Sequence, residues 1–99
     1  MFYLLMEDHR YPTIKPMLEQ GRIRKLTDIF IYIPRTVLAN DMGRNLKRLN
    51  ELLDRLENFT IKDLLLIGGL CSLTRKEMLA LLEAEFDFRE QARMAQRNH

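Results

Sequence analysis

The sequence predicts an all-α domain, a five-helix bundle with a short N-terminal arm or helix. Apolar residues recur at spacings of three and four along most of the chain, which is typical of amphipathic helices. Most of these stretches follow a threonine or asparagine that can cap a helix, and several end at glycine or proline. Ninety-nine residues, 46% hydrophobic and 30% charged, suit one globular domain with a single core.

The N-terminal segment, residues 1–21, is predicted to be an arm followed by a short helix. Residues 1–12 have no helical period and could form a short strand or an ordered arm. The stretch TIKPMLEQG favours a helix. Thr13 can cap its start, Pro16 is tolerated in the first turn, and Gly21 follows its end.

Residues 22–33 form the next predicted helix. Its apolar stripe consists of Ile23, Leu26, Ile29, Phe30 and Ile33. Pro34 ends the stretch, because the residue before a proline avoids the α region.

Two more helices are predicted over residues 36–42 and 45–56. Thr36 is the expected N-cap of the first, which stops at Gly43. Asn45 is the expected N-cap of the second. The leucines on one side of the second helix are Leu46, Leu49, Leu52, Leu53 and Leu56.

The last two predicted helices cover residues 61–71 and 75–88, and each begins with a capping-box pattern. Thr60 is followed by Asp63 three residues later, and Thr74 by Glu77. Residues 61–71 are apolar nearly all round, which predicts a central buried helix. Gly68 and Gly69 within it indicate close packing of another helix. The predicted core residues are Leu38, Leu49, Leu52, Leu64, Ile67 and Leu81.

The net charge of +2 is unevenly distributed. Residues 22–48 contain seven basic and two acidic residues, a local charge of +5, so the rest of the chain carries −3. This asymmetry favours one positive region on a nearly neutral body, although basic clusters are often only solvated surface.

No motif typical of an enzyme or a cofactor-binding protein is present in the sequence. It has no Ser/His/Asp set, no Cys/His pair and no glycine-rich phosphate loop. Cys71 lies in an apolar run, which favours a buried thiol and a reducing cytoplasm, and with His9 and His99 it forms no metal-ligand pattern. We therefore expect no catalytic residue, metal, cofactor or small-molecule substrate. The opening MFYLLM is too short for a signal sequence or a membrane span, so no membrane association is expected.

The stretch from Arg35 to Leu82 resembles the Cro/C1-type, phage-repressor-like helix-turn-helix domain. Leu38-Ala39 and Met42-Gly43 match the pattern of that family's second helix, and Leu49 and Leu52 match the inward pair of its recognition helix. The segments FTIKDLLLIGGL and SLTRKEMLALL match the last two helices. The stretches IFIYIPRTVLANDMG and FTIKDLLLIGGLC are also similar to a group of short bacterial proteins of this type.

This resemblance implies a sequence-specific DNA-binding protein that acts as a transcriptional regulator on double-stranded DNA. Helix 45–56 would then read the major groove, with Lys47, Arg48, Asn50 and Glu51 near base edges. The implied phosphate contacts are Arg35, Thr36, Arg44 and Asn45, with Arg22, Arg24 and Lys25 as outer contacts.

A protein-interaction module on the same scaffold is the alternative. Leu46 stands where many relatives carry a polar base-reading residue, and Glu51 repels phosphate unless it accepts a hydrogen bond from cytosine. Because a fold does not determine function, both classes remain open.

A homodimer is also expected, because Cro/C1-type domains usually bind paired half-sites. The helix-turn-helix domain is assigned to residues 22–88, and residues 89–99 are either an extension of the last helix or a frayed tail. The apolar residues available for a dimer surface are Phe2, Tyr3, Leu4, Leu5, Phe86 and Phe88, while Phe2, Tyr3 and Tyr11 could instead cover the core.

Overall fold

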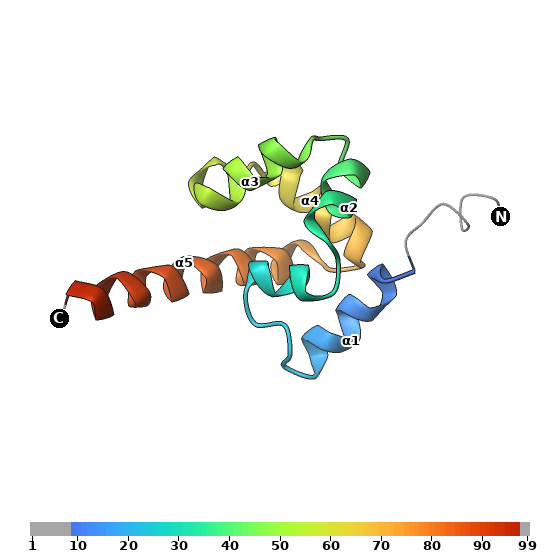
Figure 1. The fold of residues 1–99 in the computed structure, drawn as a ribbon. Helices are drawn as coiled ribbons and strands as arrows, with labels where there is room; N and C mark the ends of the chain where they lie inside the picture. The colour runs from blue at the N-terminus through green and yellow to red at the C-terminus, as the bar shows by residue number, and fades with distance from the viewer. Residues whose placement is uncertain (1–8, 98–99) are drawn as a thin grey trace.

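The predicted helical class is confirmed by a computed structural model that describes residues 9–97, a range in which no strand occurs (Figure 1). The elements are η2 (Tyr11–Thr13), α1 (Ile14–Glu19), η3 (Leu26–Ile31), α2 (Arg35–Asp41), α3 (Leu46–Asp54), η4 (Leu56–Asn58), α4 (Ile61–Cys71) and α5 (Arg75–Arg97), where η denotes a 3-10 helix. None of these helices is long and apolar enough to cross a membrane.

Three of the predicted helix starts carry the predicted caps. The side-chain oxygen of Asn45 accepts from the backbone N–H of Arg48 at 2.7 Å. Thr60 and Asp63 exchange hydrogen bonds of 3.1 and 3.2 Å, which is a complete capping box. The box formed by Thr74 and Glu77 is also present, with distances of 2.8 and 3.1 Å.

The predicted caps at Thr36 and Thr13 are wrong. α2 begins at Arg35, directly after Pro34, whose ring fixes φ and which occupies the N-cap position. Thr36 therefore lies in the first helical turn. Thr13 has helical backbone angles because η2 leads straight into α1, and its hydroxyl donates to the carbonyl of Arg10 at 2.6 Å. Neither threonine therefore caps the N–H groups of its helix.

The predicted helix over residues 22–33 is also wrong, because only η3 forms there. The carboxylate of Asp28 accepts from the backbone N–H groups of Arg24 and Lys25 at 2.8 and 3.2 Å. This arrangement keeps Lys25 extended, with φ −145° and ψ 167°, and starts the helix after it. The β-branched isoleucines that follow further disfavour a long α-helix. Ile23 is nevertheless buried, so the apolar stripe was a valid signal of the core.

α4 has the predicted bounds, but its predicted burial on all sides is wrong. Ile61 is 55% exposed and Leu65 is 51% exposed, because the neighbouring α5 and η2 cover only one side of the helix. A Cβ at Gly68 would lie 2.9 Å from both the Leu73 carbonyl oxygen and the Met78 side chain, whereas one at Gly69 would meet nothing within 4 Å. The close packing predicted at the two glycines is therefore confirmed for Gly68 alone.

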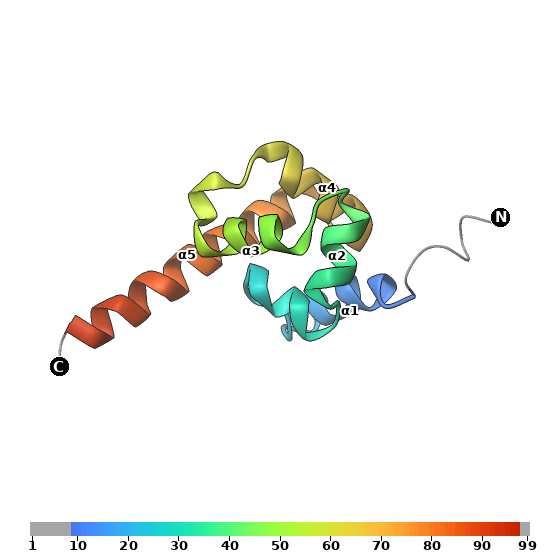
Figure 2. The same cartoon turned by 45° about the horizontal axis from the view of Figure 1, so that its top comes forward.

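α5 continues to Arg97, well past the predicted end at residue 88. Its first half packs on the domain through Met78, Leu81 and Glu85, which are buried. From Glu90 onward every described side chain is exposed, and the helix projects away from the other elements (Figures 1 and 2). The extension of the last helix, one of two alternatives for residues 89–99, is thus observed as far as Arg97.

One hydrophobic core joins all the described elements. All six predicted core residues are buried. Tyr11 and Ile14 belong to the same core, so the described part of the N-terminal segment packs as part of the domain. Tyr11 therefore covers the core, while the other apolar candidates near the N-terminus, Phe2, Tyr3, Leu4 and Leu5, lie outside the described residues.

Candidate nucleic-acid interface

α2 and α3 pack against each other across a four-residue turn, residues 42–45 (Figure 2). Gly43 adopts φ +74°, a backbone conformation that side chains disfavour, and this allows the chain to reverse. The N–H of Arg44 then bonds the carbonyl of Ala39 at 2.9 Å, closing the end of α2. This turn fixes how α3 is presented on the surface.

The leucine stripe of α3 determines which of its side chains face solvent. Leu49, Leu52 and Leu53 are buried, so Lys47 and Glu51 project from the opposite side and are exposed. Arg48 is also exposed, and its guanidinium lies 3.9 Å from the Glu51 carboxylate, a loose surface pair. The first two turns of α3 therefore present two cations to solvent.

Asn50 is held by Arg35 from the start of α2. A guanidinium nitrogen of Arg35 donates to the side-chain oxygen of Asn50 at 2.9 Å, and the same guanidinium lies 5.3 Å from the ring of Phe30. Because guanidinium can only donate, this contact fixes which end of the Asn50 amide faces Arg35. The two predicted contacts are thus brought together, and the amide NH₂ of Asn50 remains directed away from Arg35.

Arg44, a predicted phosphate contact, instead pairs with a buried carboxylate. Its guanidinium donates to Asp63 at 2.5 Å, and the Asp63 side chain is only 1% exposed. Burial raises the pKa of Asp63, but the N–H and hydroxyl of Thr60 and the guanidinium of Arg44 outweigh that effect and hold the pKa below its usual value. Arg44 therefore joins the starts of α3 and α4, and its charge is largely compensated within the domain.

Two other predicted contacts lie beside α3, and one basic residue was missed. The Asn45 side chain is occupied as the α3 cap, whereas Thr36 is exposed on the first turn of α2. Lys62 is exposed in the first turn of α4, next in sequence to the Asp63 that binds Arg44. The capping box at Thr60 could have revealed this position, since it starts a helix immediately before Lys62.

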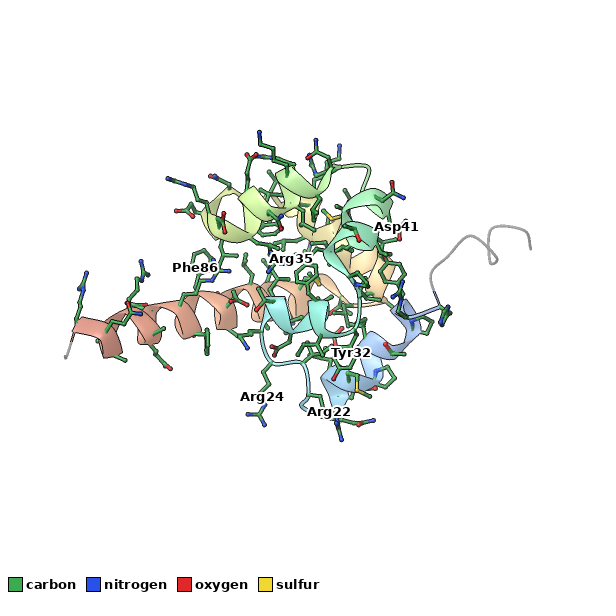
Figure 3. The ribbon with its side chains drawn as sticks, viewed as in Figure 1. Arg22, Arg24, Tyr32, Arg35, Asp41 and Phe86 are labelled. Carbon is green, nitrogen blue, oxygen red and sulfur yellow. The ribbon has the colours of Figure 1, made fainter. Side chains whose placement is uncertain are left out.

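The three predicted outer contacts are not brought together with α3. Arg22 and Arg24 lie at the edge of the molecule opposite α3 (Figure 3), and the Arg24 guanidinium donates to the carbonyl of Gly21 at 2.9 Å. Lys25 pairs with Asp28 at 2.8 Å and lies 4.6 Å from the centre of the Phe88 ring. Arg22 and Arg24 lie in the link before η3, and Lys25 is the extended N-cap residue of η3.

The comparisons with known proteins identify no relative: no family model, curated protein or solved structure matches this chain. No group of three or more potential metal ligands occurs among residues 9–97. The site is therefore defined by its own geometry: a helix with exposed cations, packed against a second helix across a tight turn.

Proposed function

We propose that this chain binds double-stranded DNA by placing α3 in the major groove. The observation that carries the proposal is the exposure of Lys47 and Arg48 on the first two turns of α3, a helix whose opposite side packs against α2 and the core. An α-helix fits the width of the major groove, and basic side chains at its N-terminal end can reach guanine edges and phosphates. Lys47 has no ion-pair partner among the described residues, so its charge is available.

Flanking residues supply the backbone contacts in this proposal. Arg35 and Thr36 at the start of α2 and Lys62 at the start of α4 are exposed. Phosphate contacts of this kind position a protein without reading sequence. The NH₂ group of Asn50 is then a donor for a base acceptor, with its oxygen already bound to Arg35.

A protein-interaction module is the second candidate, and a specific observation favours it. Glu51 and Asp54 are exposed on α3, where they reduce the positive potential that DNA requires. Ile61 and Leu65 form an exposed apolar strip on α4, and exposed apolar patches are typical of protein contacts. In this reading the cations of α3 serve only as solvated surface.

A titration of fluorescent duplex DNA of mixed sequence, at low and at moderate salt, tests the proposal. The wild type is compared with the double variant Lys47→Glu/Arg48→Glu and with a control, Arg22→Glu/Arg24→Glu. Both variants change the net charge equally, but only the first alters α3. We expect binding that weakens with salt, a loss of at least about tenfold in the α3 variant, and a smaller loss in the control.

Two outcomes contradict the proposal. One is wild-type affinity no tighter than millimolar at low salt, which is weaker than ordinary non-specific binding. The other is an equal loss in both double variants, because the effect then follows net charge and not the position of α3. Either outcome favours the protein-interaction candidate.

A further inference from the structure

The side-chain amide of Asn50 is held by a contact between two helices. Asn50 lies in the middle of α3 and is half-buried, between the buried Leu49 and the exposed Glu51. Its side-chain oxygen accepts from a guanidinium nitrogen of Arg35 at 2.9 Å. The carbon of the same guanidinium lies 5.3 Å from the centre of the Phe30 ring, so Arg35 contacts both η3 and α3 (Figure 3). Together these contacts favour one orientation of the Asn50 amide.

This orientation leaves hydrogen-bond donors available on α3. An asparagine amide has one acceptor oxygen and an NH₂ group with two donors, whereas a guanidinium has donors alone. With its oxygen bound to Arg35, the NH₂ group of Asn50 has no partner among residues 9–97. Lys47, exposed one helical turn earlier, adds an ammonium group that has no ion-pair partner among the same residues. A ligand at this position therefore meets donors and must supply acceptors.

The four bases differ in the acceptors that they expose in the major groove. Guanine presents two acceptors, N7 and O6, and thymine presents O4 beside a methyl group. Adenine presents N7 beside an amino group, and cytosine presents an amino group. The bidentate contact of an asparagine with adenine requires the amide oxygen to accept from that amino group. Here the amino group would have to share the oxygen of Asn50 with the Arg35 cation, which disfavours adenine.

We infer that Asn50 reads guanine, and that Arg35 is the positioning residue that determines this choice. The inference rests on the proposed binding of DNA by α3 and names the base that one of its side chains selects. Adenine and cytosine, which carry an amino group in the major groove, are disfavoured at this position. Glu51, the next residue, is exposed and supplies a carboxylate that can accept from the amino group of the paired cytosine. Both bases of a G·C pair then have a partner on α3.

Arg35 has two separable effects in this arrangement. A guanidinium has five N–H donors, so Arg35 retains donors for a phosphate oxygen while one of its nitrogens binds Asn50. The phosphate contact acts alike on every sequence, whereas the contact with Asn50 changes which base is read. Overall affinity and its salt dependence therefore report the first effect. The ratio of the affinities for two bases at one position reports the second.

Selection from a randomised duplex library, followed by titration of single duplexes, tests the inference. The position that Asn50 reads is the one at which Asn50→Ala loses its base preference. Four duplexes that differ only at this position are then titrated with the wild type and each variant. The wild type is expected to bind the guanine duplex at least about tenfold more tightly than the adenine duplex. Circular dichroism confirms that each variant remains helical.

Two substitutions of Arg35 separate the orientation of Asn50 from the charge. Arg35→Met is expected to weaken binding to all four duplexes and to reduce the guanine-to-adenine ratio to about threefold or less, because the freed oxygen can accept from adenine. Arg35→Lys keeps a cationic donor and is expected to retain the preference for guanine. Lys62→Gln is the control, because the loss of a phosphate contact is expected to lower affinity without changing the ratio.

Failure of DNA binding and failure of the base choice give different results. If no duplex binds more tightly than millimolar at low salt, the proposed function and the inference are both wrong. If the wild type binds DNA but prefers adenine at the Asn50 position, the inference alone is overturned. An unchanged ratio in Arg35→Met also overturns it, because Arg35 then acts only on phosphate. So does an Asn50→Ala variant with the base preferences of the wild type at every position, because Asn50 then reads no base.

Discussion

Arg44, just before α3, donates a hydrogen bond of 2.5 Å to Asp63 in the first turn of α4. The carboxylate also accepts from the N–H of Thr60, so one buried acid both caps α4 and fastens the start of α3 to it. This contact ties the turn before α3 to the first turn of α4. The helix proposed to contact DNA therefore begins next to an ion pair in which Asp63 is buried and Arg44 is partly exposed.

The Arg44–Asp63 pair is expected to matter more for stability than the exposed pair on α3. Arg44→Met leaves a buried carboxylate without its cation and is expected to lower the free energy of unfolding by about 2–4 kcal/mol. Arg48→Met, which removes the 3.9 Å surface pair with Glu51, is expected to cost less than about 1 kcal/mol. Urea unfolding of both variants measures the difference. Equal losses would show that the Asp63 pair is not structural.

Acid is expected to destabilise the fold through three carboxylates. Burial raises the pKa of Asp28 and of Asp63, but hydrogen bonds and neighbouring cations outweigh it, and the net pKa of each is below the ordinary 3.8. The pKa of Glu77 is lowered from 4.5, first by its hydrogen bond from Lys15. Because the folded pKa values are depressed, this stability is fully present above the unfolded values and is lost as pH falls through the folded ones.

Thermal unfolding from neutral pH down to about pH 3 measures this loss. We expect little change down to about pH 5 and a steep fall below it. Asp63→Asn is the matched variant: it is expected to be less stable at neutral pH but to lose less on acidification, since one of the three groups no longer titrates. An equally steep fall in Asp63→Asn would mean that Asp63 does not contribute to the acid response.

The two neighbouring glycines of α4 provide a matched pair. Gly68→Ala forces a Cβ to within 2.9 Å of the Leu73 carbonyl oxygen and the Met78 side chain, and we expect a loss of about 1–3 kcal/mol. Gly69→Ala meets nothing within 4 Å and is expected to stabilise the protein by about 0.5–1 kcal/mol, since alanine favours the helix. Melting temperatures that shift in the same direction for both variants would contradict the close packing at Gly68.

Local signals predicted the helices of the second half of the chain well. The caps at Asn45, Thr60 and Thr74 and the leucine stripes depend only on neighbours within a turn or two, so the sequence contains them directly. The predicted helix over 22–33 was wrong because the Asp28 carboxylate accepts hydrogen bonds from the backbone N–H groups of Arg24 and Lys25. The spacing of apolar residues contains no information about this side-chain interaction.

The candidate site was harder to predict, because its electrostatics depend on contacts between distant residues. Arg44 was predicted to contact phosphate, but its charge is compensated by the carboxylate of Asp63, nineteen residues later in the sequence. Arg22 and Arg24 belong to the same basic stretch of sequence as α3, residues 22–48, but they lie far from α3 in space. The exposed side of α4 was not predicted either, because exposure also depends on which distant elements pack on the helix. The exposed Lys62 was missed for this reason.

Cys71 is expected to be inert in the folded protein. The thiol is fully buried, and burial raises its pKa to about 12, so almost no thiolate forms near neutral pH. A chromogenic disulfide reagent at mildly alkaline pH should therefore react only as fast as the protein opens, and at full speed in denaturant. Rapid reaction of the native protein would show that the helix end around Cys71 opens readily.

The salt dependence of DNA binding separates the basic residues by position. Lys62→Gln removes an exposed cation from the first turn of α4, next in sequence to the Asp63 that binds Arg44, so it is expected to weaken binding to all sequences alike and to reduce the salt slope by about one unit. Arg22→Gln removes the same charge at the opposite edge of the molecule and is expected to leave the slope unchanged. Titrations of both variants at several salt concentrations give the two slopes. If Arg22→Gln lowers the slope and Lys62→Gln does not, the DNA lies against the link before η3, and α3 is not the helix that enters the groove.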